Sequence, residues 1–269
     1  MSSKENKEAQ NIIDVSANRS ELSIYESLVK AEADRRSIQK ARSIGTDLRK
    51  LESRYFGPEV GFIRRASNLK LIENLDMGGR LLDYGCGGAW WKDEYWPQFK
   101  KVTACEVDRS ALVEISNTFP DTRLWWTANG IIDTSEKFDV VLSSSVLGYI
   151  LPEQARLHVQ CAYELLEKNG QFILTRVLAL DLIAILRAQR LVELPGPSFA
   201  YHYSRTELKS LLQATGFRDI KYVPLGIRIP GLDWRLMQSF YRFAPAIMRD
   251  ALPILFPMLK IHHMFLARK

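Results

Sequence analysis

The hydrophobic pattern divides the chain into a helical N-terminal part and a region in which short apolar runs alternate with helices. Within residues 20–53 and again within 60–76, apolar residues recur every three or four positions, which predicts amphipathic helices. Beyond these, runs rich in strand-forming residues follow at 80–84, 102–106, 122–127, 138–143, 171–177, 219–225 and 262–267. Strands that alternate with helices predict an α/β fold with a mostly parallel sheet and helices on both faces.

Two helices have recognisable ends in the sequence. Pro152 is typical of a helix start, and Gly170 is expected to end that helix. Its buried stripe is predicted from the apolar residues Leu157, Cys161, Leu165 and Leu166. A later helix is predicted over Ser204–Ala214, where Ser204 caps the N-terminus and Glu207 completes a capping box.

The same pattern predicts the domain organisation. Residues 1–20 are polar and are expected to form a flexible tail, residues 21–76 an N-terminal helical cap, and residues 77–269 one sheet domain. Between the last two strands, residues 226–261 form an insertion rich in aromatic residues, Arg and Pro, which we expect to act as a helical lid. Its arginines recur every seven residues, which keeps the last three near one helix face: Arg228, Arg235, Arg242 and Arg249.

Composition and charge narrow the class of protein. Of 269 residues, 46% are hydrophobic and 25% charged, as in globular proteins. The chain has 37 basic and 31 acidic residues, but residues 218–269 hold 9 and 3 of them, which leaves 28 of each elsewhere. This modest, local excess disfavours a nucleic-acid partner. It favours a lipophilic or anionic acceptor, or weak contact of residues 228–260 with an anionic membrane surface.

Cysteine usage and the N-terminus predict the compartment. The chain has 3 cysteines, and none belongs to a CxxC or Cys/His ligand pattern, so we expect no metal site and a reducing environment. The first residues lack the apolar core of a signal peptide, and no stretch reaches the ~20 apolar residues of a membrane span. We therefore expect a cytoplasmic protein, either a monomer or a homodimer.

A glycine-rich turn after the first strand of the sheet domain is the main candidate binding feature. Residues 81–90 read LLDYGCGGAW, and such a turn lets backbone N–H groups approach a ligand closely. Glu106 ends the next strand, 19 residues after Gly87, where a carboxylate can accept hydrogen bonds from two ribose hydroxyls. A dinucleotide fingerprint would require a third glycine where Trp90 stands, so a dehydrogenase is disfavoured.

LLDYGCGG at 81–88 resembles motif I of the class I S-adenosylmethionine-dependent methyltransferases. Similar segments follow in the family's order: Glu106, FDVV at 138–141, SSSVLGYI at 143–150, LEKNGQFIL at 166–174 and the YS…EL…GF pattern at 203–217. The resemblance implies a Rossmann-like, seven-stranded, mostly parallel sheet and S-adenosyl-L-methionine as cofactor. It implies that twelve residues contact this cofactor: Tyr55, Arg64, Asp83, Gly85, Cys86, Gly87, Glu106, Val107, Asn129, Gly130, Ser143 and Ser144.

Two positions depart from the family's pattern. Ala89 stands where a third loop glycine is usual, and Asn129 stands where an acid usually binds the adenine amino group. Alanine is small, and the amide oxygen of Asn129 can accept the same hydrogen bond without a charge. Asp83 has a simpler interpretation as a helix cap. These departures leave open a non-catalytic cofactor-binding protein of the same fold.

The resemblance implies transfer of a methyl group to a nucleophile without a metal. Most of the rate acceleration should come from alignment and exclusion of water, and a hydroxyl acceptor also needs a base. The catalytic candidates are His202, Tyr149 and Arg176, and the reference pKa of histidine, about 6.5, suits a base.

We therefore predict O- or N-methylation of a small-molecule acceptor, such as a natural product, a glycan-related metabolite or a lipid-like molecule. An RNA methyltransferase is the alternative. It is disfavoured because residues 143–146 read SSSV, in place of the N/D-P-P-aromatic motif of base methylation.

Overall fold

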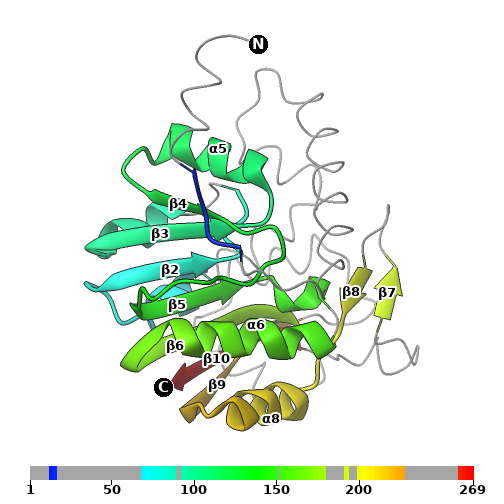
Figure 1. Ribbon diagram of the computed structural model, residues 1–269. Helices are drawn as coiled ribbons and strands as arrows, with labels where there is room; N and C mark the ends of the chain where they lie inside the picture. Colours follow the sequence, from blue (N-terminus) through cyan, green and yellow to red (C-terminus); the bar gives the residue numbers. More distant parts are fainter. Residues whose placement is uncertain are drawn as a thin grey trace, which may run out of the picture.

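The computed structural model describes residues 12–16, 68–88, 92–150, 152–179, 191–193, 199–227 and 260–269. Their centre is an eight-stranded sheet in the order β1-β4-β3-β2-β5-β6-β10-β9 (Figure 1). Its strands are β1 (Ile12–Asp14), β2 (Arg80–Tyr84), β3 (Lys101–Glu106), β4 (Arg123–Trp126), β5 (Phe138–Ser144), β6 (Leu166–Leu178), β9 (Arg218–Ile227) and β10 (Lys260–Arg268).

The strands from β1 to β6 pair in parallel, and β10 pairs antiparallel with both β6 and β9. The predicted Rossmann-like α/β fold is therefore confirmed. The sheet has eight strands, one more than predicted, because β1 adds an edge strand beside β4.

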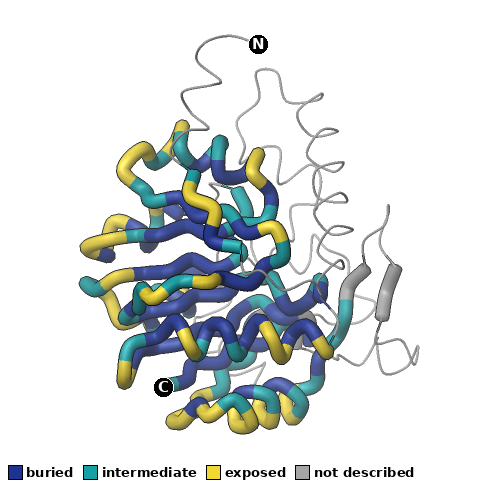
Figure 2. The backbone as a smooth tube through the Cα atoms, in the orientation of Figure 1, coloured by how far each residue is buried: buried dark blue, intermediate teal, exposed yellow. Residues whose placement is uncertain are grey.

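The strands at the centre of the sheet are mostly buried (Figure 2), and each face of the sheet carries its own apolar cluster, as expected for parallel strands covered on both sides. Helices α6 (Pro152–Leu165) and α8 (Arg205–Thr215) pack on one face, through residues such as Val159 and Leu212. Helix α5 (Arg109–Thr118), the 3-10 helices η2 (Lys92–Glu94) and η3 (Trp96–Gln98), and the short helical segment 68–72 cover the other. The carboxyl ends of β2, β3, β5 and β6 thus meet at one edge between the two layers.

Local helix signals were partly right. The capping box is confirmed: the Glu207 N–H donates to Ser204 Oγ at 3.2 Å, and the Ser204 N–H donates to Glu207 Oε2 at 2.7 Å. Helix α6 begins at Pro152 as predicted but ends at Leu165, and the chain then enters β6 directly.

The predicted buried stripe of α6 was wrong at its first residue, and the rest of the stripe is buried as predicted. Leu157 is exposed, whereas its neighbours His158 and Val159 are buried, together with Ala155 and Ala162. The small alanines let the helix approach the sheet closely, so the buried face is centred on them and includes a histidine that hydropathy alone places outside.

Three short strands were not predicted from the sequence. Residues 12–16, within the predicted flexible tail, form β1 and an isolated bridge from Ser16 to Ile132. Strands β7 (Leu191–Glu193) and β8 (Phe199–Tyr201) form a separate antiparallel pair. The predicted insertion does connect β9 and β10, but its residues 228–259, like most of the predicted helical cap at 21–76, lie outside the described residues.

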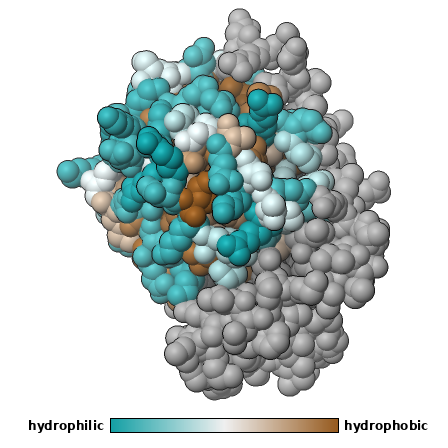
Figure 3. Space-filling model, turned by 90° about the horizontal axis from the view of Figure 1, so that it is seen from below, coloured by the Kyte–Doolittle hydropathy of each residue, from teal (hydrophilic) through white to brown (hydrophobic). Residues whose placement is uncertain are grey.

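The described part of the surface seen from below is mostly hydrophilic, with smaller hydrophobic areas within it (Figure 3). In the described part of the chain, the large apolar side chains that are exposed are few and scattered: Ile13, Leu69, Met77 and Leu157. No helix in that part is both long and apolar enough to cross a membrane.

Candidate cofactor and active site

The glycine turn leaves β2 and folds onto the neighbouring strand β3. The N–H groups of Gly85 and Cys86 both donate to the Cys105 carbonyl, at 2.9 and 3.0 Å. Gly85 and Gly87 have φ values of 75° and 62°, in the left-handed region that favours glycine. A Cβ on Gly85 would collide with the Val146 side chain, whereas none of the described residues has an atom within 4 Å of a Cβ placed on Gly87. The turn therefore keeps open space beside the second glycine.

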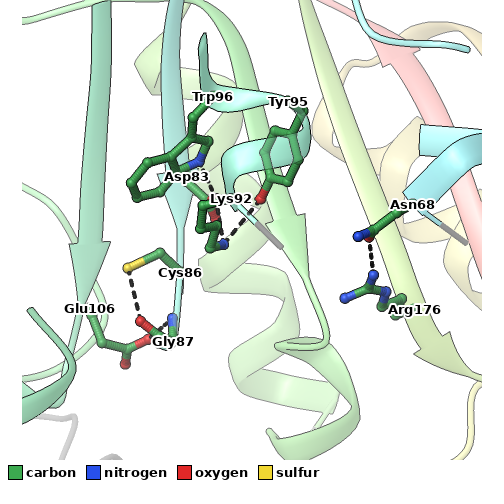
Figure 4. Close-up of polar contacts among 9 residues, drawn as sticks. All are labelled: Asn68, Asp83, Cys86, Gly87, Lys92, Tyr95, Trp96, Glu106 and Arg176. Carbon is green, nitrogen blue, oxygen red and sulfur yellow. Dashed lines mark hydrogen bonds and ion pairs between the residues drawn. The ribbon is translucent and has the colours of Figure 1, made fainter. Parts of the chain in front are cut away.

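Glu106 faces this turn from the end of β3 (Figure 4). Its Oε2 accepts the Gly87 N–H at 2.6 Å, and its Oε1 accepts the N–H groups of Val107 and Asp108 at 2.8 and 3.3 Å. Three backbone donors thus fix the carboxylate beside the turn. Because each carboxylate oxygen can accept two hydrogen bonds, this anchoring is compatible with a further hydrogen bond from a ribose hydroxyl.

Asp83 lies two residues before the turn, at the centre of a buried polar cluster (Figure 4). Its Oδ2 accepts hydrogen bonds from Lys92 Nζ at 2.7 Å, Tyr95 OH at 2.8 Å and Trp96 Nε1 at 3.0 Å. Its Oδ1 is buried without a hydrogen-bond partner in the described part of the chain. The motif I acid therefore anchors the segment that follows the glycine turn.

The charges of this cluster follow from its surroundings. Burial lowers the pKa of Lys92, but Asp83, Tyr95 and Cys86 together raise it by more, so the pKa lies above its ordinary value. Burial, reinforced by Asp83, raises the pKa of Tyr95. Lys92 is thus an ammonium and Tyr95 a neutral phenol, so both can donate to Asp83. Sequence reasoning missed both residues, although a lone lysine within WWKDEYW at 90–96 signals a buried, paired cation.

The cysteines at this edge are not poised as nucleophiles. Cys86 and Cys105 are free and buried, and burial raises the pKa of each thiol well above its ordinary value. The Cys86 thiol donates to the Gly87 carbonyl at 3.5 Å. Cys86 therefore belongs to the turn as a small packed residue, and its predicted contact with the cofactor would come from its backbone.

The loop at residues 127–131 lies next to Glu106, because the Thr127 N–H donates to the Glu106 carbonyl at 3.3 Å. The amide oxygen of Asn129 accepts the Ile131 N–H at 3.1 Å and so closes a turn within the loop. The same oxygen lies 3.2 Å from the Thr127 hydroxyl, so the predicted hydrogen bond with adenine would compete with Thr127 for it. At Gly130, the backbone carbonyl accepts the Tyr84 hydroxyl, which ties the loop to the end of β2.

Ser143 has a partner in the core. Its hydroxyl lies 2.9 Å from Nε2 of His158 on α6, and both residues are buried. His158 also stacks on Tyr84, with ring centroids 4.0 Å apart, and burial lowers the pKa of His158 to about 3. Side chains alternate along a strand, so Ser144 points to the opposite face. The structure thus gives Ser143 a partner in the core, and its contact with the cofactor stays a prediction.

His202 lies at the carboxyl edge, beside the residue that follows β6. Its Nδ1 is 2.8 Å from the carbonyl oxygen of Ala179. A carbonyl can only accept, so Nδ1 must carry the proton, and in the neutral imidazole the lone pair is on Nε2. His202 is half-buried. This tautomer is the one that a base acting through Nε2 requires.

Arg176 and Tyr149 complete the predicted catalytic candidates. Arg176 has a φ of 55° in a bulge of β6, where two residues oppose Met264 of β10. Its guanidinium donates to Asn68 Oδ1 (Figure 4), which connects β6 with the helical segment 68–72. Tyr149 ends the 3-10 helix η4 (Leu147–Tyr149) and is half-buried.

The structure therefore brings Gly85, Cys86, Gly87, Glu106 and Val107 together, with the 127–131 loop beside them. Tyr55 and Arg64 lie outside the described residues.

Comparison with known proteins identifies the family. A family model described as a methyltransferase domain matches residues 61–222, which is more than half of the chain. The protein belongs to this family, as the resemblance of its glycine motif predicted. It is an S-adenosylmethionine-dependent methyltransferase of the class I type, and S-adenosyl-L-methionine is its cofactor. No curated protein matches the sequence.

Several solved structures have the same fold. One is 1,6-didemethyltoxoflavin-N1-methyltransferase from Burkholderia thailandensis, with 19% identity, a TM-score of 0.56, and coverage of 95% of this chain and 93% of that one. Magnesium protoporphyrin IX methyltransferase from Synechocystis has 12% identity, a TM-score of 0.56 and coverage of 91% and 98%. A SAM-dependent methyltransferase from Archaeoglobus fulgidus has 14% identity, a TM-score of 0.52 and coverage of 81% and 98%. At these identities the likeness shows the fold alone.

The residues present fit the cofactor. The anchored Glu106 carboxylate lies where a ribose hydroxyl can donate to it, and the space that the described residues leave beside Gly87 lets a ligand reach the backbone of the turn. Glu106 ends β3 and Gly87 lies in the turn after β2, so both features lie at the carboxyl edge of the sheet, where ligands bind in open α/β folds.

Proposed function

We propose that this methyltransferase methylates a hydroxyl group of a small-molecule acceptor, with His202 as the general base. The observation that carries the proposal is the hydrogen bond between His202 Nδ1 and the Ala179 carbonyl at 2.8 Å. It selects the tautomer whose Nε2 can accept a proton. An amine acceptor needs no such base, whereas a hydroxyl does, so this tautomer favours O-methylation over N-methylation.

In the proposed reaction, His202 Nε2 accepts the hydroxyl proton while the acceptor oxygen bonds the methyl carbon and the methyl–sulfur bond breaks. When bound, the cofactor supplies that methyl group on a positively charged sulfur. The Ala179 carbonyl accepts from Nδ1 throughout, so it stabilises the imidazolium that forms. His202 then releases the proton to solvent, and the products are the methylated acceptor and S-adenosylhomocysteine.

A small acceptor is supported by charge and by the related structures. The basic excess of the chain is confined to residues 218–269, and the remainder has 28 basic and 28 acidic residues, unlike a surface built for nucleic acid. Two proteins of the same fold are named for small acceptors, 1,6-didemethyltoxoflavin and magnesium protoporphyrin IX.

The test is a comparison of His202→Ala with the wild-type protein on methyl-labelled cofactor and a panel of small hydroxyl and amine compounds, read by mass spectrometry. We expect the variant to slow O-methylation by about 10²–10⁴-fold without weakening cofactor binding. His262→Ala, which removes a half-buried histidine on β10, is the matched control and should retain the wild-type rate. Methylation of amines alone, or an unchanged rate in His202→Ala, would contradict the proposal.

A further inference from the structure

Strand β1 is an addition to the sheet that places the N-terminal segment beside the candidate cofactor site. In Figure 1 it appears in dark blue next to β4, at the edge of the sheet. Its residues pair in parallel with Leu124, Trp125 and Trp126. Because β4 leads directly into the 127–131 loop, the residues that follow β1 are carried alongside that loop.

Val15 forms backbone hydrogen bonds with residues before and after the loop. The Val15 N–H donates to the Trp126 carbonyl at 2.9 Å, before the loop begins, and the Asp133 N–H donates to the Val15 carbonyl at 2.9 Å, after it ends. Val15 is buried in the same apolar cluster as Ile131 and Ile132. The N-terminal segment therefore closes the two limbs of the loop against each other.

Ser16 contacts the loop itself. Its Oγ accepts the Ala128 N–H at 2.8 Å and donates its own hydrogen to Asp14 Oδ1 at 2.6 Å. Asp14 Oδ1 also accepts the Ser16 N–H at 2.9 Å, so the carboxylate orients the hydroxyl toward Ala128. Ala128 immediately precedes Asn129, which is predicted to bind the adenine of the cofactor, and Gly130, which is predicted to contact the cofactor.

The loop is also hydrogen-bonded to the residues that flank the glycine turn and Glu106. Tyr84, directly before Gly85, donates its hydroxyl to the Gly130 carbonyl, and the Thr127 N–H donates to the Glu106 carbonyl at 3.3 Å. Trp126 Nε1 donates to the Val107 carbonyl at 2.8 Å. The loop is thus braced by the two strands that carry the cofactor-binding residues and, on its outer side, by Ser16.

We infer that β1 and Ser16 are positioning elements of the cofactor site, which hold the 127–131 loop in the conformation that receives the nucleoside end of S-adenosylmethionine. Ser16 acts through the Ala128 backbone and does not touch the cofactor. The inference rests on the assignment of this loop to the cofactor and is independent of the identity of the acceptor.

The test is isothermal titration of S-adenosylhomocysteine and of 5′-methylthioadenosine, which shares the nucleoside but lacks the amino-acid end. Ser16→Ala removes the acceptor of one backbone hydrogen bond and should raise the Kd of both ligands by the same factor, up to about tenfold. Ser16→Thr keeps a hydroxyl and should restore the Kd. Ser116→Ala is the control. It removes a hydroxyl on α5 that donates to the Val113 carbonyl, and it should bind both ligands as the wild type does.

The number of binding sites per chain distinguishes a displaced loop from partial unfolding. Partial unfolding lowers the number of sites per chain, whereas a displaced loop raises the Kd with about one site retained. A Kd of Ser16→Ala within twofold of the wild type, or a loss seen only in the stoichiometry, overturns the inference. If the wild-type protein binds neither ligand, the cofactor assignment fails as well, so the two failures are distinguishable.

Discussion

Lys92→Met removes the ammonium that is paired with Asp83 and keeps an unbranched side chain of similar length. Lys92 Nζ lies 2.7 Å from Asp83 Oδ2, and the two side chains are 6% and 0% exposed. Removing one partner of a buried ion pair costs about 3–5 kcal/mol, because the other charge remains in a medium that solvates it poorly. Tyr95 and Trp96 still donate to Oδ2, so we expect a loss near the lower end, about 3 kcal/mol.

The double variant Asp83→Asn/Lys92→Met removes both charges. The amide oxygen of the introduced asparagine can still accept from Tyr95 and Trp96, so most of the loss should be recovered, leaving about 1.5 kcal/mol or less. Urea unfolding followed by far-UV circular dichroism gives the free energies of unfolding without relying on Trp96 as the probe.

Lys70→Met is the matched control for this cycle. It breaks the Lys70–Glu73 pair, which is similarly close at 2.8 Å but has side chains 28% and 57% exposed, so the expected cost is only about 0–1 kcal/mol. Two results would show that the two charges do not stabilise each other and would contradict the reasoning. One is unfolding of Lys92→Met at the same urea concentration as Lys70→Met. The other is a double variant whose loss of stability equals the sum of the losses in the single variants Asp83→Asn and Lys92→Met.

Three further predictions follow from the same geometry. The pKa of His158 is about 3 in the native state and 6.5 in the unfolded state, so below pH 6.5 the native state binds fewer protons than the unfolded state. The free energy of unfolding should therefore fall by about 2 kcal/mol from pH 7 to pH 5. In urea unfolding, His158→Gln should show a smaller fall over this range. Gly85→Ala should lower the melting temperature, since its Cβ meets Val146 at a positive φ. Gly87→Arg should abolish cofactor binding in calorimetry with an unchanged circular dichroism spectrum, because it fills open space.

Much of the sheet could be predicted because its strands are continuous apolar runs that are buried on both faces. Strand β2 has the predicted bounds of 80–84, and β5 differs by one residue at its end. The α8 capping box was equally predictable, since it depends on residues three apart. Glu106 was found because a carboxylate at the end of the second strand of the domain has a fixed relation to the glycine turn.

The remaining features depend on contacts that sequence spacing does not encode. Strand β1 has three residues and pairs with β4 more than 100 positions later, so its local pattern resembles a polar tail. Asp83 meets Lys92 only because the segment after the turn folds back over the sheet. The face of α6 was misassigned at Leu157 because His158 is buried through its stack on Tyr84 and its hydrogen bond with Ser143, which hydropathy cannot register.

Titration of S-adenosylhomocysteine into the wild-type protein and into Glu106→Ala tests the central claim most directly, namely that the glycine turn and Glu106 form the cofactor site. The account predicts one site per chain for the wild type and a Kd at least about tenfold higher for Glu106→Ala, because a hydrogen bond to a charged group contributes about 1.5–3 kcal/mol. A wild-type protein that binds no ligand, or a Glu106→Ala variant that binds as tightly as the wild type, would contradict it.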